Sequence, residues 1–127
     1  MGKSETLRGQ GAFDALFASG LRTNALLFRC LYKFECAPPG TVRVGFLVPR
    51  NSGSAVRRNR LRRLMREAFR REQDGFLEAL HEAGRSVALA FVFRGSSAEG
   101  PFHLDTVHRD IQQLCRSVLA SAVRVPQ

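Results

Sequence analysis

The chain has 127 residues and a formal net charge of +9, from 20 basic and 11 acidic side chains. Its length suits a single domain over residues 1–127, and a hydrophobic content of 44% argues for a packed globular protein over a disordered tail. The three cysteines lack C-x-x-C spacing, so we expect a reduced, cytoplasmic protein without a disulfide framework or a zinc site. No apolar run approaches the length of a membrane span, so we expect no membrane partner.

The N-terminal segment predicts a loose arm followed by one short helix. Residues 1–9 are mostly polar, and we expect them to form a flexible arm. After them, Phe13, Leu16 and Phe17 recur at i, i+3 and i+4, the spacing of one face of a helix. The sequence therefore predicts an amphipathic helix from about residue 10 to residue 18, which ends just before a glycine.

Strand-forming residues follow this helix. Residues 25–34 (ALLFRCLYKF) are typical of a β-strand, either one long strand or two shorter ones. Alternation places Leu31 and Tyr32 on opposite faces of it. Residues 37–40 (APPG) form a turn, so we expect the strand over residues 41–48 (TVRVGFLV) to return antiparallel.

The excess charge of the chain is local. From Arg50 to Arg71 there are nine arginines and one acidic residue, Glu67, which gives this segment a net charge of +8. Like charges four residues apart on a helix repel by a few tenths of a kcal/mol per pair, so helix stability does not explain the pattern. A local excess of this size indicates a polyanionic partner, either nucleic acid or an anionic membrane surface.

The same segment has the pattern of an amphipathic helix. Ser54 is a candidate N-cap for it. We expect Gly75 to interrupt the helix and Gly84 to end it. Its apolar residues have the spacing i, i+3, i+4, i+7, and we expect this stripe to pack on a core. The stripe consists of Leu61, Leu64, Met65 and Ala68.

The C-terminal part predicts a buried strand and a closing helix. Residues 86–93 (SVALAFVF) are nearly all apolar, as expected for a strand buried on both faces. A loop over residues 95–101 follows, and from Leu104 onward the apolar residues again have helical spacing. The order α, β, β, α, β, α predicts an α+β sandwich with helices against a small sheet.

The sequence offers no catalytic centre of its own. Its histidines, His81, His103 and His108, do not have a metal-ligand spacing. No Ser, Cys or Lys lies in a known nucleophile motif. We therefore expect neither catalytic residues nor a metal site in this chain, and no small-molecule substrate.

Nucleic acid is the polyanion that the basic segment favours. Runs of charge on helices usually mark solvated faces, but here acidic partners four residues away are almost absent. Asn59 adds a neutral donor and acceptor among the arginines, which suits contacts to sugar or base edges. A helix-turn-helix DNA-binding protein would need a second helix directly before this one, whereas the sequence predicts a strand there.

These residues also carry a family resemblance. The stretch AVRRNRLRRLMREAF over residues 55–69 resembles the A-V-x-R-N-R-[IL]-[KR]-R-x-x-R-E-x-F signature of the bacterial ribonuclease P protein subunit. FDALFASG over 13–20 resembles that family's F-x-x-[VL]-F-x-x-G, and RVGFLV over 43–48 resembles its R-[VI]-G-x-x-V. The segments occur in the family's order, and the resemblance extends over most of the chain.

The resemblance implies a fold like ribosomal protein S5 domain 2, in which an unusual left-handed β-α-β crossover carries the basic helix. It also implies that a catalytic RNA subunit, with Mg²⁺, removes the 5′ leader of precursor tRNA. The protein would bind that RNA and hold the leader in a cleft beside the sheet. A ribosomal protein, or a general binder of structured RNA, is the alternative.

Residue by residue, the resemblance implies two sets of contacts. The leader cleft would contain Phe13, Phe17 and Tyr32, because any base can stack on an aromatic ring at roughly 1–3 kcal/mol. Plain packing of helix on sheet is the other explanation for Phe13 and Phe17. The residues implied to bind the RNA subunit are Arg50, Arg58, Asn59, Arg60, Arg62, Arg63 and Arg66.

The chain departs from the family pattern in two places. The family commonly has two adjacent lysines after the second strand, where this chain has Arg50 and Asn51, preceded by Pro49. Counted from the first helix, the family's strand aromatic falls on Leu31 instead of Tyr32. A slip of one residue in a strand reverses the face on which a side chain lies.

Overall fold

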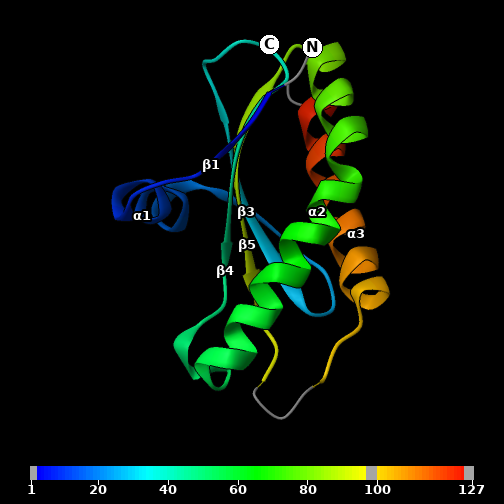
Figure 1. Ribbon diagram of the computed structural model, residues 1–127. Helices are drawn as coiled ribbons and strands as arrows, with labels where there is room; N and C mark the ends of the chain where they lie inside the picture. The colour runs from blue at the N-terminus through cyan, green and yellow to red at the C-terminus, as the bar shows by residue number, and fades with distance from the viewer. Residues whose placement is uncertain (1–2, 97–99, 125–127) are drawn as a thin grey trace.

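The computed structural model describes residues 3–96 and 100–124, and it shows a mixed sheet between two layers of helix (Figure 1). Helix α1 covers one face of the sheet, and α2 and α3 lie together on the other. The predicted α+β sandwich is confirmed. The elements are β1 (Lys3–Thr6), α1 (Gln10–Ser19), β2 (Leu21–Asn24), β3 (Phe28–Glu35), β4 (Thr41–Leu47), the short 3-10 helix η1 (Arg50–Ser52), α2 (Ala55–Ala83), β5 (Ser86–Phe93) and α3 (Leu104–Arg124).

Strand β5 occupies the centre of the sheet. The five strands have the order β1-β4-β5-β3-β2, and β5 is antiparallel to β3 but parallel to β4. Strands β3 and β4 therefore run in opposite directions, as expected from the turn between them. They do not pair with each other, because β5 lies between them.

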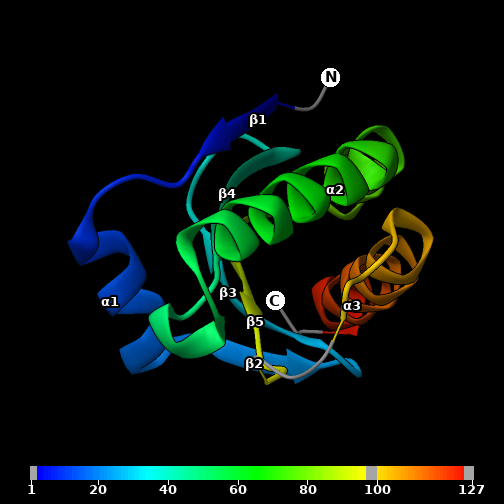
Figure 2. The same cartoon turned by 60° about the horizontal axis from the view of Figure 1, so that its bottom comes forward.

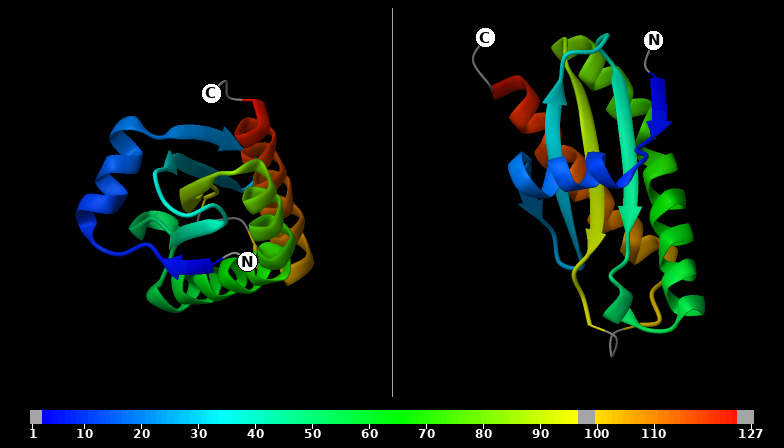
Figure 3. Two further views of the ribbon diagram at one scale, coloured as in Figure 1. Left: turned by 90° about the horizontal axis from the view of Figure 1, so that it is seen from above. Right: turned by 90° about the vertical axis from the view of Figure 1, so that its left-hand side faces the viewer.

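The connection from β4 through α2 to β5 is left-handed. In the right-hand view of Figure 3, seen from the α1 side, both strands run downward, α2 returns behind the sheet, and β5 lies to the left of β4. Nearly all β-α-β units have the opposite hand. The left-handed crossover implied by the family resemblance is thus present. Figure 2 shows that α2 consequently passes over β4, while α3 lies on the side of β3 and β2.

Alternate residues of β5 belong to two different cores. Ala88, Ala90 and the partly buried Val92 face α1, whereas the other four apolar residues face α2 and α3 and are at most 1% exposed. Small side chains on the α1 face allow α1 to lie close to the sheet. A Cβ atom on Gly45 of β4 would come within 2.5 Å of the Phe13 ring. The β5 residues that face α2 and α3 are Val87, Leu89, Phe91 and Phe93.

The N-terminal segment is part of the sheet. We expected a flexible arm over residues 1–9, but β1 pairs in parallel with β4 as an edge strand. Leu7 is 3% exposed, and its N–H donates to the Val44 carbonyl at 2.8 Å. The expectation is therefore wrong for residues 3–7; residues 1–2 lie outside the described chain. An edge strand held by backbone hydrogen bonds needs no apolar alternation, so the polar sequence gave no sign of it.

Helix α2 is continuous over 29 residues, a length of roughly 43 Å at 1.5 Å per residue. Ser54 caps it as predicted, because its Oγ accepts a hydrogen bond from the Arg57 N–H at 3.2 Å. Gly75 does not interrupt it, contrary to our expectation. One glycine costs a helix only about 1 kcal/mol, and burial of Phe76 and its neighbours on the core outweighs that cost. Gly84, with φ of 70°, ends the helix as expected.

A buried carboxylate fixes the turn between β2 and β3. Asp110 of α3 is 7% exposed. Its carboxylate accepts hydrogen bonds from the N–H groups of Leu26 (3.2 Å), Leu27 (2.8 Å) and Phe28 (3.0 Å). Within the segment 25–34, residues 28–34 belong to the single strand β3, and residues 25–27 make the turn that is fastened to α3. The second strand, β2, lies before this segment and was not predicted.

Candidate nucleic-acid interface

The arginine-rich half of α2 has a buried face and an open face. Leu61, Met65 and Ala68 are at most 3% exposed, and Leu64 is partly buried against the same core. This confirms the packing stripe predicted from the sequence. Successive residues of a helix are rotated by about 100°, so the arginines between these positions are directed away from the core.

Four of the predicted RNA-contacting residues surround one open hollow on α2, which we call the α2 hollow. Within it, Arg62 Nη2 donates to Asn59 Oδ1 at 2.6 Å, and the Arg66 guanidinium lies 5.9 Å from the centre of the Phe46 ring. Because the amide oxygen of Asn59 faces Arg62, its NH₂ group remains a donor. Guanidinium groups beside an amide donor suit phosphate and sugar oxygens. The lining consists of Val56, Asn59, Arg62, Arg63 and Arg66.

The other predicted arginines lie outside the α2 hollow. Arg58 Nε donates to the Gly53 carbonyl at 3.3 Å, which directs this side chain toward the loop before the helix. Arg50 is exposed in η1. Arg60 is exposed, but it is rotated by about 200° from Arg62 and lies on the other flank of α2. Their contacts with RNA remain predictions.

Arg57 was not included among the predicted RNA-contacting residues. It connects the loop before α2 to the loop after β5. Its Nε donates to the Ser52 carbonyl at 2.8 Å, and its Nη2 donates to the Ser96 carbonyl at 3.1 Å. The guanidinium also lies 5.7 Å from the centre of the Phe102 ring. These contacts give Arg57 a structural role.

Little of the charge of α2 is neutralised within the described part of the chain. The ion pair between Arg70 and Glu67 (3.3 Å) is exposed, and pairs of that kind have little strength in water. Glu72 contacts His108 of α3 at 2.6 Å instead of an arginine. None of the arginines that line the α2 hollow has a carboxylate partner among residues 3–96 and 100–124. The hollow thus keeps its positive charge.

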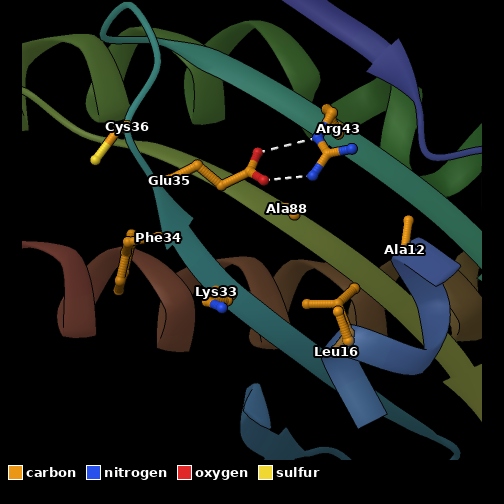
Figure 4. Close-up of a pocket in the computed structure, with 9 residues that line it drawn as sticks. Ala12, Leu16, Lys33, Phe34, Glu35, Cys36, Arg43 and Ala88 are labelled. Carbon is orange, nitrogen blue, oxygen red and sulfur yellow. Dashed lines mark hydrogen bonds and ion pairs between the residues drawn. The ribbon is translucent and has the colours of Figure 1, made fainter. Parts of the chain in front are cut away.

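A second concave surface, the α1 pocket, lies on the other face of the sheet (Figure 4). Its volume is about 330 Å³. Lys33 of β3, Ala88 of β5 and Arg43 of β4 lie side by side in the sheet. The small side chain of Ala88 between these two long side chains leaves the space. The lining consists of Ala12, Ala15, Leu16, Lys33, Phe34, Glu35, Cys36, Arg43 and Ala88.

None of the three aromatics predicted for the leader cleft lines the α1 pocket. Phe13 is half-buried and packs above Gly45. Phe17 is 44% exposed. At 100° per residue, these two rings lie on one flank of α1, and Ala12 and Ala15 lie on the other. Phe13 therefore packs on the sheet, and Phe17 is the ring that remains open to a partner.

Tyr32 does not face α1. It is 6% exposed in the core beneath α2 and α3, and its ring centre lies 5.8 Å from that of Phe34. Its neighbour Leu31 is the residue that faces α1, where it is fully buried. The assignment of Tyr32 to a cleft on the α1 face is therefore wrong, and the slip of one residue along β3 is the reason.

Glu35 and Arg43 form a two-pronged ion pair within the α1 pocket (Figure 4). Arg43 Nε donates to Glu35 Oε1 at 3.0 Å, and Arg43 Nη2 donates to Glu35 Oε2. The hydrogen bond to Glu35 raises the pKa of Arg43. The pair cancels the charge of Arg43 and leaves Lys33 as the pocket's uncompensated cation among the described residues. This pair could not be predicted from the sequence, because its members come from different strands.

The three cysteines differ in burial. Burial raises the pKa of Cys30 and of Cys115, with a further contribution from their neighbours Cys115 and Glu72 respectively. Cys36 is exposed. Because alkylation requires the thiolate, iodoacetamide at pH 8 is expected to modify Cys36 alone in the folded protein and all three cysteines after unfolding. Intact-mass spectrometry measures this, and modification of the folded Cys36→Ser variant would contradict it.

No group of three or more His, Cys, Asp or Glu side chains among the described residues is placed to hold a metal ion. The contact between His108 and Glu72 joins α2 to α3, and Gln112 supports it by donating to Glu72 at 3.2 Å. None of the helices in the described part of the chain has the length and apolar character needed to cross a membrane.

Comparison with known proteins gives one consistent result. The family model described as Ribonuclease P matches residues 1–118. The ribonuclease P protein component of Chlorobaculum tepidum is 36% identical over 138 residues, which cover 98% of this chain and 85% of that protein. The solved RNase P protein of Thermotoga maritima has a TM-score of 0.69 and 25% identity, and covers 97% of this chain and 99% of its own. The RNase P protein of Staphylococcus aureus, at 15% identity, has a TM-score of 0.67 over 89% of this chain and 94% of its own.

Proposed function

The chain belongs to the ribonuclease P protein family, whose members are the protein components of an endoribonuclease that acts in tRNA processing. From this premise we propose which parts of the protein bind RNA and which steps belong to the RNA subunit. The protein binds the catalytic RNA subunit through α2 and the 5′ leader of precursor tRNA through the face that carries α1. The RNA subunit cleaves the substrate, in the cytoplasm, to produce the mature 5′ end.

The α2 hollow is the observation that carries this proposal. The hollow is lined by Asn59 and by three arginines, Arg62, Arg63 and Arg66. None of these arginines has a carboxylate partner in the described part of the chain. Arg62 and Arg66 are held in place by Asn59 and by the Phe46 ring, so less side-chain entropy is lost when a phosphate binds. A cluster of guanidinium groups of this kind suits a folded RNA backbone.

The leader is assigned to the α1 face because single-stranded RNA is bound through base stacking and cationic contacts. Phe17 offers an exposed ring there. Phe13 is committed to packing over Gly45, and it supports the helix that presents Phe17. Stacking on Phe17 is independent of base identity, because every base has a π-face.

Catalysis is assigned to the RNA subunit. The described side chains provide no cluster of metal ligands. We therefore assign the Mg²⁺ ions that the reaction requires to the RNA subunit and the substrate. The contribution of this chain is then to increase affinity for substrate and to orient the leader.

Reconstitution tests the proposal. We expect the purified protein, mixed with its RNA subunit in Mg²⁺ at moderate salt, to increase kcat/KM for leader removal at least tenfold over RNA alone. One stacked base at about 1–3 kcal/mol already corresponds to a factor of this size. Absence of any gain in rate or affinity would refute the proposal. Co-purification of the tagged protein with ribosomes, without enrichment of one structured RNA, would instead favour a general RNA-binding protein.

A further inference from the structure

We propose that the α1 pocket is a second subsite for the 5′ leader, which holds one nucleotide on the flank of α1 opposite Phe17. The inference rests on the proposed function and adds a site to it. Its residues are Lys33, Glu35 and Arg43, above a floor made by Ala88. It predicts that affinity for substrate depends on leader length beyond the nucleotide that stacks on Phe17.

The shape of the pocket suits a nucleotide base. A volume of about 330 Å³ lies within the range of small-ligand sites. Its floor and its α1 wall are apolar, formed by Ala88, Leu16, Ala12 and Ala15. A planar base can lie against such a surface with its polar edge directed outward. The polar groups of the pocket stand on β3 and β4, at the side away from α1 (Figure 4).

The charged side chains of the pocket suit two different parts of a nucleotide, its phosphate and the edge of its base. Lys33 is exposed and has no carboxylate partner among the described residues, so it can bind a phosphate. Arg43 is less suited to that role, because Glu35 occupies two of its donors. The remaining N–H groups of Arg43 and the remaining lone pairs of Glu35 offer donors beside acceptors, which matches the edge of a base.

The position of α1 separates the two subsites. Leu16 points to the sheet, Ala12 and Ala15 flank the pocket, and Phe17 lies on the other flank of the helix. A strand that stacks on Phe17 must pass around or over α1 to reach Ala88. Only a leader that extends several nucleotides past the one stacked on Phe17 can therefore occupy both Phe17 and the α1 pocket.

Filling the pocket from its exposed wall tests the inference without changing the core. Ala15 is exposed and lines the pocket, whereas Ala18 is exposed on the same helix outside it. We expect Ala15→Leu to weaken holoenzyme binding of a long-leader precursor tRNA about tenfold, the value of one stacked base. Ala18→Leu is expected to have no such effect. The substrates form a series whose leaders are shortened one nucleotide at a time, and the loss must disappear for the shortest leaders.

Lysine substitution provides a second measurement. Lys33→Ala is expected to lower the slope of log affinity against log salt by about 0.7 for long leaders, as for one single-strand phosphate contact. Lys3→Ala, the same change at the β1 edge, is expected to leave the slope unchanged. Cys36 lies at the pocket, so a long leader and not a short one should slow its alkylation.

The outcomes separate the inference from the proposed function. If the wild-type protein activates the RNA subunit but Ala15→Leu behaves like Ala18→Leu at every leader length, the pocket is not a leader subsite. A loss of equal size for every leader length would also overturn the inference, because it would place the contact on the RNA subunit. If the wild-type protein gives no activation at all, the proposed function itself fails.

Discussion

Reversing the charge of Arg62 and Arg66 together is expected to weaken binding of the RNA subunit about 100-fold. Both residues line the α2 hollow, and neither has a carboxylate partner among the described residues. A hydrogen bond to a charged group contributes about 1.5 kcal/mol or more, a factor of at least ten for each contact that is lost. The slope of log affinity against log salt should fall by about 1.4 to 1.8, since two phosphate contacts disappear. Binding of labelled RNA subunit at several salt concentrations measures both quantities.

The matched control is the double variant Arg109→Glu/Arg116→Glu on α3. These two arginines are exposed, and the two double substitutions change the net charge of the protein by the same amount. We expect a loss of less than about threefold, because only long-range attraction changes and salt screens it. An equal loss in both double variants would show that RNA responds to total charge and not to the α2 hollow.

Replacing Asp110 with alanine is expected to lower the free energy of unfolding by about 2–6 kcal/mol. The change removes the acceptor of three backbone N–H groups, and those of Leu27 and Phe28 are buried. Each buried donor left without a partner costs about 1–3 kcal/mol. Since domains are stable by only about 5–15 kcal/mol, the variant is expected to lie near the limit of folding. Urea unfolding followed by circular dichroism measures the change.

Asp105→Ala is the control for this second variant. Asp105 is on the same helix, and its side chain is 90% exposed, 3.8 Å from Arg71. A surface ion pair of this kind contributes about 0–1 kcal/mol. Comparable losses in both variants would mean that α3 is sensitive to any change in charge, and that the hydrogen bonds of Asp110 are not what stabilises the turn.

The elements with strong periodicity were predictable from the sequence. The stripe of Leu61, Met65 and Ala68 indicated both that α2 is a helix and which side of it is buried. The apolar run of β5 likewise indicated a strand buried on both faces. In these segments the burial of apolar side chains is the main contribution to stability. The spacing of the apolar residues in the sequence therefore indicates which side of the element is buried.

The pocket was not predictable, because it depends on how distant segments align. Lys33, Ala88 and Arg43 become neighbours only when β5 inserts between β3 and β4 with one particular register. The placement of Tyr32 failed for a related reason, since a count along β3 that is wrong by one residue exchanges its two faces.

Asp110 did leave a signal in the sequence. It is a charged residue among the apolar positions Val107, Ile111 and Leu114 of an amphipathic helix. A carboxylate in such a stripe must find donors in the core. The pattern does not say which donors, because Leu27 and Phe28 lie more than eighty positions away in the chain.

The central place of β5 also determines when this protein can fold as it emerges from the ribosome. Strands β3 and β4 are synthesised early and can pair with β2 and β1, but the other edge of each must wait for β5, which follows the whole of α2. The turn before β3 then awaits α3, which carries Asp110. Pairings between distant segments form slowly, and exposed apolar strands are prone to aggregation in the meantime. The N-terminal half of the nascent chain is therefore exposed to misfolding until synthesis is nearly complete.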